Sequence, residues 1–290
     1  MKSKSITMVK GYVDDLTHTP TKEYLVDAGG EYHEAAAKLF GSELTTISAD
    51  QMIREFDECG VEKMIVVGWD AETQSGLPRV PNEFVAKYIE GYPDRMVGFA
   101  SVDPNKGKVA VADLEHAVRD LGLRGLKLHP MAQGFYPSDK RFYPLWEKCV
   151  ELKIPVQFHT GTSGWGKLLP GGGGAKLDYS NPIYLDSVAA DFPELQIVML
   201  HQAFPWVKVQ LAVAAHKRNV YVDLSGYSPK YFEPELITYM TKLIPDKFMF
   251  GSDYPFLKPG RWLKDFELLK VSDEVKMKVL RDNAVRFYRL

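Results

Sequence analysis

The feature that most constrains this chain is the regular alternation of short β-rich runs with longer stretches of helical periodicity. Segments with helical spacing separate the runs, and several of the helix-to-strand turns carry Gly or Pro. This alternation predicts repeated βα units and a parallel sheet. The predicted strands are 9–14, 63–67, 96–101, 124–128, 154–158, 195–200, 219–224 and 247–251, and the clearest helices are 48–59, 107–121, 141–152, 182–191, 205–217, 233–243 and 273–288. Eight βα units predict a closed (β/α)8 TIM barrel, an α/β fold.

The length of the chain fits one domain of this kind. A (β/α)8 barrel takes about 250 residues before insertions, and the chain has 290. No stretch has the composition of a linker, so we expect a single barrel domain over 1–290. Two longer segments follow predicted strands: a helical insertion at about 19–47, expected to form a flap, and a Gly-rich loop at about 160–178.

The glycine run at 170–174 in the second of these segments has two interpretations. Four consecutive glycines give the backbone unusual freedom at an entropic cost. The run could form a mobile lid or a backbone nest for an anion over the site. It could equally be a plain surface loop, and the sequence leaves both interpretations open.

Charge and composition exclude several classes of partner. Lys plus Arg (36) nearly balances Asp plus Glu (38), so we expect neither nucleic acid nor a membrane surface as partner. No signal-peptide pattern or membrane-length apolar run occurs, which predicts a cytoplasmic protein. Neither Cys59 nor Cys149 has a Cys or His at zinc-finger spacing, and we interpret both as buried, reduced packing residues. Neither G-x-G-x-x-G after a strand nor a P-loop occurs, which disfavours a nucleotide-binding protein.

Polar residues recur where the predicted strands end. In a barrel these positions converge on one mouth, where active sites of this fold lie. They comprise His18, Trp69, Asp70, Asp103, Lys127, His129, His159, His201, Asp223, Ser225 and Asp253, whereas the three other histidines, His33, His116 and His216, fall in helical stretches. The grouping predicts an active site at the barrel mouth.

Four of these residues have the chemistry of a metal site. His18, His159, His201 and Asp253 come from different strands, and imidazole with carboxylate suits zinc and similar divalent ions. For His159 the other interpretation is a hydrogen-bonded barrel histidine. For Asp253, which precedes Tyr-Pro, the other interpretation is a turn or helix-cap residue.

Six motifs together resemble a known family. They are GLKLHP at 125–130, VQFHTGT at 156–162, MLHQAFPW at 199–206, VYVDLSG at 220–226, FMFGSDYPF at 248–256 and DNAVRFY at 282–288. The chain resembles the amidohydrolase-related (amidohydrolase 2) group of the metal-dependent hydrolase superfamily, which includes aminocarboxymuconate-semialdehyde decarboxylase and the resorcylate-type decarboxylases. The resemblance spans nearly the whole chain.

The resemblance implies roles for four residues. His159 and Asp253 would be ligands of one divalent metal ion, usually Zn²⁺, with Mn²⁺ as the alternative. His201 would be the acid/base or water-orienting group, and Asp253 would also take a proton. The family's first strand carries a His-x-His or Glu-x-His pair, but here Leu16 stands at the first of these positions and only His18 remains.

The departure at Leu16 leaves the metal site short of one ligand. Leucine cannot coordinate a metal. Asp14 or Asp15 would replace it only if the strand register were shifted. A site without the fourth ligand could bind its metal more weakly, bind another ion, or bind none.

Other residues at the mouth are candidate substrate contacts. Lys127 lies on the strand that, in binuclear relatives, carries a carboxylated lysine. We prefer a different role, in which the Lys127 ammonium binds a carboxylate of the substrate. The alternative is an ion pair between Lys127 and a neighbouring acidic residue. His129 is a substrate contact or a hydrogen-bonded loop residue. Aromatic residues in the same loops suit a small planar ligand or belong to barrel packing; those taken as candidate substrate contacts are Trp69, Trp165, Phe204 and Tyr254.

These observations lead to one main hypothesis and two alternatives. The main hypothesis is a metal-dependent carbon–carbon lyase, a non-oxidative decarboxylase of a small aromatic or unsaturated carboxylic acid. A metal-dependent hydrolase of a small ester, lactone or amide would use the same residues. The third hypothesis is a catalytically impaired barrel that binds a small ligand. A homodimer is expected from the resemblance alone.

Overall fold

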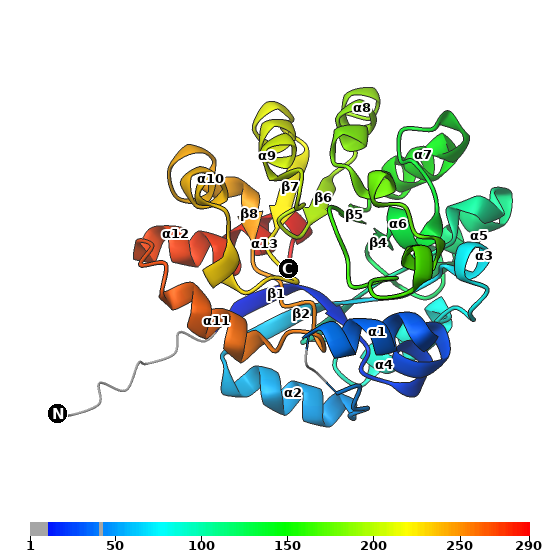
Figure 1. Ribbon diagram of the computed structural model, residues 1–290, viewed down its shortest axis with the longest axis horizontal. Coiled ribbons are helices and arrows are strands. Elements are labelled where there is room, and N and C mark those ends of the chain that lie inside the picture. The colour runs from blue at the N-terminus through cyan, green and yellow to red at the C-terminus, as the bar shows by residue number, and fades with distance from the viewer. Residues whose placement is uncertain (1–10, 41–42) are drawn as a thin grey trace.

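The computed structural model describes residues 11–40 and 43–290. Parallel strands form its centre, and neighbours in the sequence are neighbours in the sheet. The strands are β1 Tyr12–His18, β2 Val61–Val67, β3 Met96–Phe99, β4 Leu126–Leu128, β5 Val156–His159, β6 Ile197–Leu200, β7 Val220–Asp223 and β8 Phe248–Met249. Their order confirms the repeated βα units (Figure 1).

Backbone hydrogen bonds close this sheet into a barrel. The regular ladders give two runs, β1-β2-β3 and β4-β5-β6-β7-β8. A parallel bridge between Ala100 and Leu126 joins β3 to β4, and one between Thr17 and Tyr254 joins β8 to β1. The Asp15 amide also donates to the Phe250 carbonyl at 2.8 Å. The predicted (β/α)8 barrel is therefore confirmed.

Helices surround the barrel as an outer ring (Figure 1). The α-helices are α1 Gly30–Phe40, α2 Ala49–Glu58, α3 Glu72–Ser75, α4 Asn82–Glu90, α5 Lys108–Arg119, α6 Pro130–Gln133, α7 Tyr143–Leu152, α8 Ile183–Asp191, α9 Val207–His216, α10 Pro234–Thr238, α11 Pro259–Glu267, α12 Asp273–Met277 and α13 Asn283–Tyr288. The Ser48 side chain caps α2 by accepting from the Gln51 amide, as its position before the helix predicts. Across residues 11–40 and 43–290, no helix is long and apolar enough to cross a membrane.

The structure departs from the predicted elements in three places. The first strand runs to His18, beyond the predicted 9–14, and the start of that prediction lies outside the described residues. The helices predicted at 233–243 and 273–288 each contain a π-helical segment, at Tyr239–Leu243 and Lys278–Asp282. Two helices of the ring, α4 and α11, were not among those predicted.

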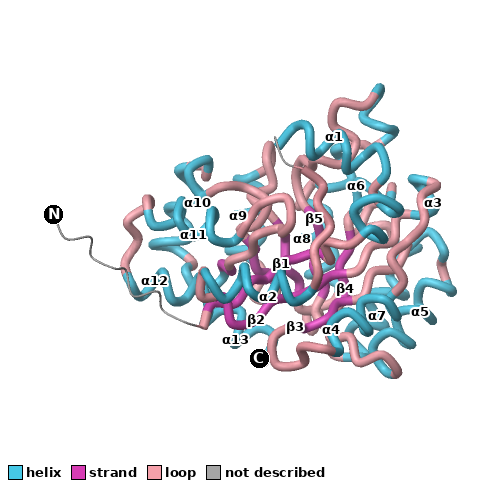
Figure 2. The backbone as a smooth tube through the Cα atoms, turned by 90° about the horizontal axis from the view of Figure 1, so that it is seen from below, coloured by secondary structure: helices cyan, strands magenta, loops and turns pink. Residues whose placement is uncertain are grey.

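The far end of the barrel is filled by α13. Figure 2 shows this helix and the C-terminus at one end of the strands and α1 at the other. Tyr288 of α13 contacts the Phe99 ring edge-on at 5.6 Å between centroids. Its hydroxyl accepts from the Gln157 amide at 3.0 Å, and the same amide donates to the Asp15 carbonyl. Inward-facing polar groups below the active site are therefore hydrogen-bonded to one another.

The insertion after β1 lies over the mouth of the barrel. It contains a π-helical segment, Glu23–Ala28, and then α1. The Tyr32 ring of α1 stacks on Trp165 at 4.2 Å, and its hydroxyl donates to the Gly173 carbonyl at 3.0 Å. The insertion, called the flap below, is thus fastened to the Gly-rich loop after β5.

Candidate active site

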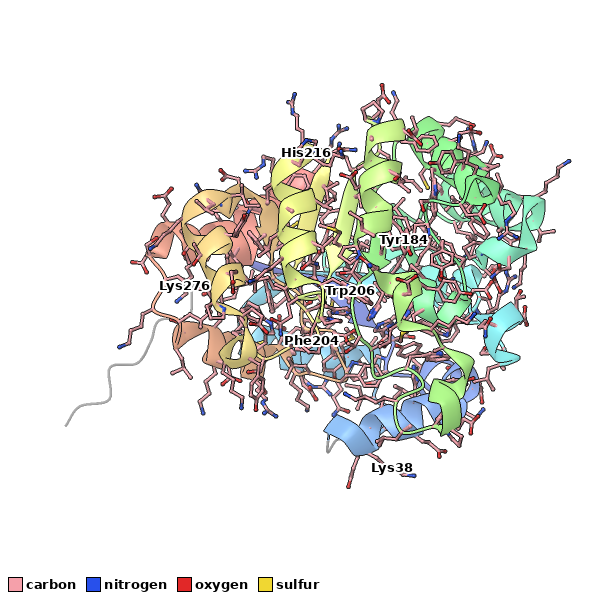
Figure 3. All side chains as sticks on the ribbon, turned by 45° about the horizontal axis from the view of Figure 1, so that its top comes forward. Lys38, Tyr184, Phe204, Trp206, His216 and Lys276 are labelled. Atoms are coloured by element: carbon pink, nitrogen blue, oxygen red, sulfur yellow. The ribbon has the colours of Figure 1, made fainter. Side chains whose placement is uncertain are left out.

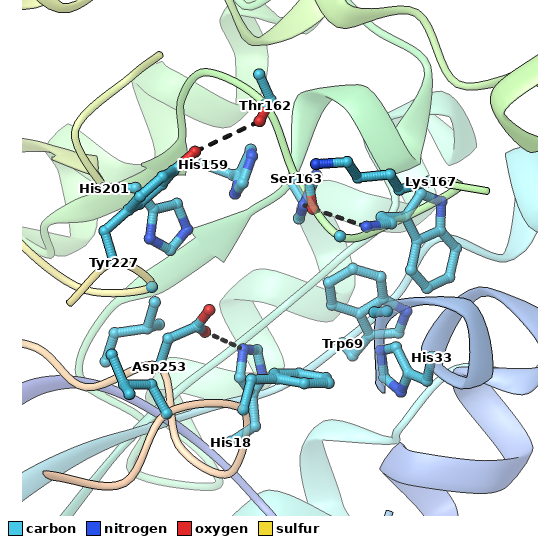
Figure 4. A pocket seen from close by; sticks show the side chains of 18 of the residues that line it. His18, His33, Trp69, His159, Thr162, Ser163, Lys167, His201, Tyr227 and Asp253 are labelled. Atoms are coloured by element: carbon cyan, nitrogen blue, oxygen red, sulfur yellow. Dashed lines mark hydrogen bonds and ion pairs between the residues drawn. The ribbon is translucent and has the colours of Figure 1, made fainter. Parts of the chain in front are cut away.

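A cavity of about 480 Å³ opens at the carboxyl ends of the strands. Eight residues singled out in the sequence for the site line this cavity: His18, Trp69, Lys127, His129, His159, Trp165, His201 and Asp253. They come from six strand ends and from the loop after β5. The fold thus brings together residues that are far apart in the sequence (Figure 4).

Two residues expected to contact substrate do not line the cavity, and these expectations need correction. Phe204 is 49% exposed and lies in the turn after β6 (Figure 3). Tyr254 is buried but points toward α2, where its hydroxyl donates to Glu55 at 3.2 Å and its ring meets Phe56 edge-on. Asp253, with its positive φ of 66°, faces the cavity, and Tyr254 after it faces the helix layer.

His18 and Asp253 form a hydrogen-bonded pair on one side of the cavity. The His18 Nε2 lies 3.4 Å from Asp253 Oδ1, and the ring stacks on Tyr24 at 4.4 Å. Burial lowers the pKa of His18 to about 4, although Asp253 opposes the shift. Burial would raise the pKa of Asp253, but the His18 hydrogen bond and the charges nearby lower it. A neutral imidazole therefore donates to an ionised carboxylate.

His159 and His129 form a stacked pair on another wall. Their ring centroids are 3.7 Å apart and nearly parallel. The Nδ1 of His129 accepts from the Ala132 amide at 3.2 Å, so its Nε2 carries the proton and donates to Ser163 Oγ at 3.2 Å. Burial lowers the pKa of both rings well below the usual value. The Nε2 of His159 is buried and has no hydrogen-bond partner among the described residues.

His201 lies beside His159 and is anchored by the end of β7. Its ring is edge-on to His159 at 4.6 Å. Its Nδ1 lies 3.0 Å from the Ser225 carbonyl and 2.9 Å from Ser225 Oγ. Burial lowers its pKa. His201 and Asp253 both have a positive φ, 68° and 66°, a conformation that costs about 1–3 kcal/mol and is concentrated at functional sites.

Lys127 places a buried amine at the floor of the cavity. The residue is 3% exposed, and its Nζ lies 4.5 Å from the centroid of the Trp69 ring. Within the described part of the chain no carboxylate lies within ion-pair distance of this amine. Burial lowers the pKa of Lys127 to about 7, while Asp253 raises it.

The structure adds residues that the sequence reasoning missed. His33 of α1 lines the cavity, is 3% exposed and meets the Trp165 ring edge-on at 5.7 Å. Burial lowers its pKa to about 3. Tyr24 and Ser163 also line the cavity. The helical stretch around His33 does not predict a place in the cavity; the signal in the sequence is its location in the insertion after the first strand.

The end of β1 determines which of its residues reach the cavity. Leu16 and His18 line it, whereas Asp14 and Asp15 do not. Asp14 accepts from the Ser252 amide at 2.8 Å, and Asp15 accepts from Gln157 at 3.1 Å. The shifted register that would have brought either aspartate into the site is therefore not observed.

The cavity contains side chains that could bind a metal ion, but they do not lie close enough together to form a complete site. His18, His159 and Asp253 face one cavity, and the unpartnered Nε2 of His159 is of the type that binds a divalent ion. In the part of the chain that the structure describes, no three His, Cys, Asp or Glu side chains come close enough together to hold a metal. Leu16 supplies no further donor. The chemistry of the set fits a divalent ion, and its geometry in this structure is that of an incomplete site.

Known proteins resemble this chain over nearly all of its length. The gamma-resorcylate decarboxylase of Polaromonas sp. strain JS666 is 23% identical, with 94% of this chain and 97% of that protein covered. An uncharacterized TIM-barrel protein from Bordetella bronchiseptica has a TM-score of 0.80 at 26% identity, covering 96% of this chain and 98% of the other. A dihydroxybenzoic acid decarboxylase from Polaromonas sp. JS666, solved with manganese and the inhibitor 2-nitroresorcinol, has a TM-score of 0.72 at 20% identity, covering 97% and 98%.

A family model agrees with these likenesses. The amidohydrolase model matches residues 44–290, which include every strand from β2 to β8 and all the cavity residues that follow them. The match covers far more than half of the chain. With its barrel and its strand-end site, the chain belongs to the amidohydrolase family.

Proposed function

We propose that this protein is a carbon–carbon lyase, a non-oxidative decarboxylase of a small aromatic or unsaturated carboxylic acid. The observation that carries the proposal is Lys127, a buried amine with no carboxylate partner in the described residues, lying over Trp69 in the cavity. A planar carboxylate would bind the ammonium and pack against the ring. The likeness to a gamma-resorcylate decarboxylase supports this choice of substrate class.

The protonation states of two residues determine how the site could handle a proton. Loss of CO₂ leaves an electron pair on carbon, and one proton must be added there. Neutral His201 and ionised Asp253 both start as proton acceptors, because the pKa of each is lowered. Either residue must first take a proton, from water or a substrate hydroxyl, before delivering it to carbon.

The walls of the cavity would orient the substrate. The hydroxyl of Ser163 accepts from His129 and from the Trp165 amide, so its own hydrogen remains available for the ligand. Trp69 and Trp165 lie 4.9 Å apart and, with His33 from the flap, form an aromatic wall that limits access of water. Such a wall with few polar groups suits a small planar acid.

A divalent metal ion belongs to the proposal. His18, His159 and Asp253 would hold it, and the resemblance implies Zn²⁺; the solved decarboxylase from Polaromonas contains manganese, which makes Mn²⁺ the first alternative. When bound, such an ion stabilises negative charge on the substrate. Elemental analysis of protein purified in unchelated buffer tests both the presence and the identity of the ion.

The activity is tested by incubating the protein with hydroxybenzoates and muconate-type acids and measuring CO₂ release. We expect release from at least one acid, and a loss of about 100-fold or more in kcat for His201→Ala. Hydrolysis of an ester, lactone or amide without CO₂ would contradict the lyase proposal. His116→Ala is the matched control, since His116 lies on α5 in surface ion pairs.

The homodimer and the cytoplasmic location stay predictions. Light scattering coupled to size-exclusion chromatography tests the first, and cell fractionation tests the second.

A further inference from the structure

We propose that Ser225 and Asp223 are positioning residues that fix His201 in one tautomer, with the proton on Nδ1 and the lone pair of Nε2 available to the cavity. The inference rests on the proposed function for the role of His201 as acid/base. It concerns the motif Asp223-Leu224-Ser225-Gly226 at the end of β7, which contains two of the polar strand-end residues but no predicted ligand or catalytic group.

The tautomer follows from the acceptor next to the ring. The Nδ1 of His201 lies 3.0 Å from the carbonyl oxygen of Ser225. A carbonyl oxygen has no proton and only accepts, so Nδ1 must be the donor. A neutral imidazole carries a single proton, and the carbonyl acceptor places it on Nδ1. Its Nε2 is therefore unprotonated, as a base requires.

The serine hydroxyl extends the same chain of donation. Ser225 Oγ lies 2.9 Å from His201 Nδ1 and forms a short hydrogen bond to Asp223 Oδ1. That carboxylate oxygen also accepts from the Ser225 amide at 2.9 Å. Because Asp223 Oδ1 accepts, the Ser225 hydroxyl donates its hydrogen to Asp223. The lone pairs of the hydroxyl oxygen can then accept from His201 Nδ1. The direction of donation runs from His201 to Ser225 to Asp223.

The three residues are held rigidly enough for this role. Asp223 and Ser225 are fully buried, and His201 is 5% exposed. Gly226 has a φ of 72° and lies against the imidazole; a Cβ there would come within 2.7 Å of His201 Nδ1. Gly226 therefore permits the close approach of the β7 loop to the ring. Gln210 donates to the His201 carbonyl at 2.7 Å and fixes the backbone from the other side.

The arrangement would matter in both halves of a proton-transfer cycle. When Nε2 takes a proton, Nδ1 keeps its own and continues to donate to Ser225. When Nε2 returns the proton, the ring regains the same tautomer without rotating. One proton enters and leaves at Nε2, and none crosses the serine.

The test is ¹⁵N NMR of the full chain labelled at histidine, because the nitrogen shifts of a neutral imidazole report which nitrogen carries the proton. His201→Gln identifies the His201 signals. We expect the Nδ1–H form in the wild type and in Asp223→Asn, whose amide oxygen still accepts from Ser225. In Ser225→Ala and Asp223→Ala the Ser225 carbonyl still accepts from Nδ1 but the ordered hydroxyl is lost, so a minor Nε2–H population should appear beside the Nδ1–H form. Ser180→Ala, a buried serine outside the cavity, is the matched control and should change nothing.

Steady-state kinetics provides a second measurement, made with the carboxylic acid that releases CO₂ in the activity assay. Ser225→Ala and Asp223→Ala should lower kcat by about 10-fold to 100-fold with KM changed less than about threefold, while Asp223→Asn restores most of kcat. An Nε2–H tautomer in the wild type would overturn the inference, even if no variant folded. So would unchanged His201 signals in both alanine variants. If the tautomers behave as expected but no acid releases CO₂, the proposed function fails and the positioning role stands.

Discussion

Lys127 is the residue whose environment says most about the ligand. A buried amine without a carboxylate partner is unfavourable unless something else satisfies it, and only the face of Trp69 does so in the described residues. A charge-assisted hydrogen bond to a bound carboxylate contributes about 1.5–3 kcal/mol. We therefore propose that the unpaired amine binds the carboxylate of the substrate.

Replacing Lys127 by Met tests this explanation. The variant keeps the apolar stem and loses the charge, so KM for the acid should rise about 10-fold to 100-fold, measured by steady-state CO₂ release. Lys247→Met is the matched control, because Lys247 also lies over an aromatic ring, Tyr221 at 4.3 Å, away from the cavity. An unchanged KM in Lys127→Met would show that the carboxylate binds elsewhere.

The same residue predicts how binding depends on pH. The pKa of Lys127 lies at about 7 because of burial, with Asp253 opposing the shift, so the amine is charged below that pH and neutral above it. Substrate binding is thus favoured at low pH. KM should rise several-fold from pH 6 to pH 8.5, and Lys127→Met should abolish this rise. The buried imidazoles facing the cavity have lowered pKa values and stay neutral over this range.

The position of Leu16 predicts that replacing it by histidine increases the affinity of the site for a metal ion. Its side chain lines the cavity on the same strand as His18, so Leu16→His adds an imidazole to the donor set. We expect the metal content measured by elemental analysis to increase, with Leu16→Ala as the control that opens the same space without a donor. Equal metal affinity in the two variants would mean that the donors do not meet at this position.

At the scale of elements, the flap and the Gly-rich loop act as one wall. Tyr32 of α1 joins them through its stack on Trp165 and its hydrogen bond to Gly173. The glycine run itself does not line the cavity, although Thr162, Ser163 and Trp165 of the same loop do. The residues of the loop that line the cavity are therefore those before the glycines.

Two substitutions of Tyr32 test whether its contacts hold the flap against the Gly-rich loop. Tyr32→Phe removes the hydrogen bond and keeps the stack, whereas Tyr32→Ala removes both. We expect KM to rise modestly in the first variant and about 10-fold or more in the second, with faster limited proteolysis of the flap. Tyr184→Ala is the control, since Tyr184 contacts Tyr136 and Asp178 outside the cavity. Identical proteolysis rates in all variants would contradict a fastening role.

Elements also explain how far the sequence predicted the fold and the site. Short β-rich runs placed all eight strands, because most residues of each strand are buried. Seven of the eleven strand-end residues line the cavity, since the barrel geometry itself directs them there; Asp70, Asp103, Asp223 and Ser225 do not line it. Phe204 and Tyr254 do not line the cavity. They lie beyond the last hydrogen bond of their strands, where the local turn determines the direction of each side chain. His33 was missed because its position depends on how the flap folds over the mouth.

At the scale of the whole molecule, a group of buried carboxyls makes stability depend on pH. Asp14, Asp15 and Asp223 are fully buried, and burial raises the pKa of each, to about 8 for Asp14 and about 7 for Asp223. The folded state thus binds these protons more tightly than the unfolded state, in which an aspartate has a pKa of about 3.9. Stability should therefore fall as pH rises from about 4 to about 8.

Asp14→Asn isolates one contribution to that slope. The amide oxygen still accepts from the Ser252 and Leu16 amides, and the side chain stays neutral at every pH. The variant should lose less unfolding free energy than the wild type between pH 5 and pH 8, by about 3–4 kcal/mol, measured by urea denaturation. Asp27→Asn, at an exposed pair with Lys22, should keep the wild-type slope. Parallel slopes for Asp14→Asn and wild type would mean that Asp14 is charged in the folded protein.

The bond between Asp14 and Ser252 joins positions 238 residues apart, and it has a consequence for biosynthesis. On the ribosome, β1 emerges first but lacks one neighbour until β8 has been translated. Until then the nascent barrel has two open edges, at which strands of other chains could pair. Synthesis speed and chaperone supply should consequently limit the soluble yield of this protein more than the stability of its finished fold does.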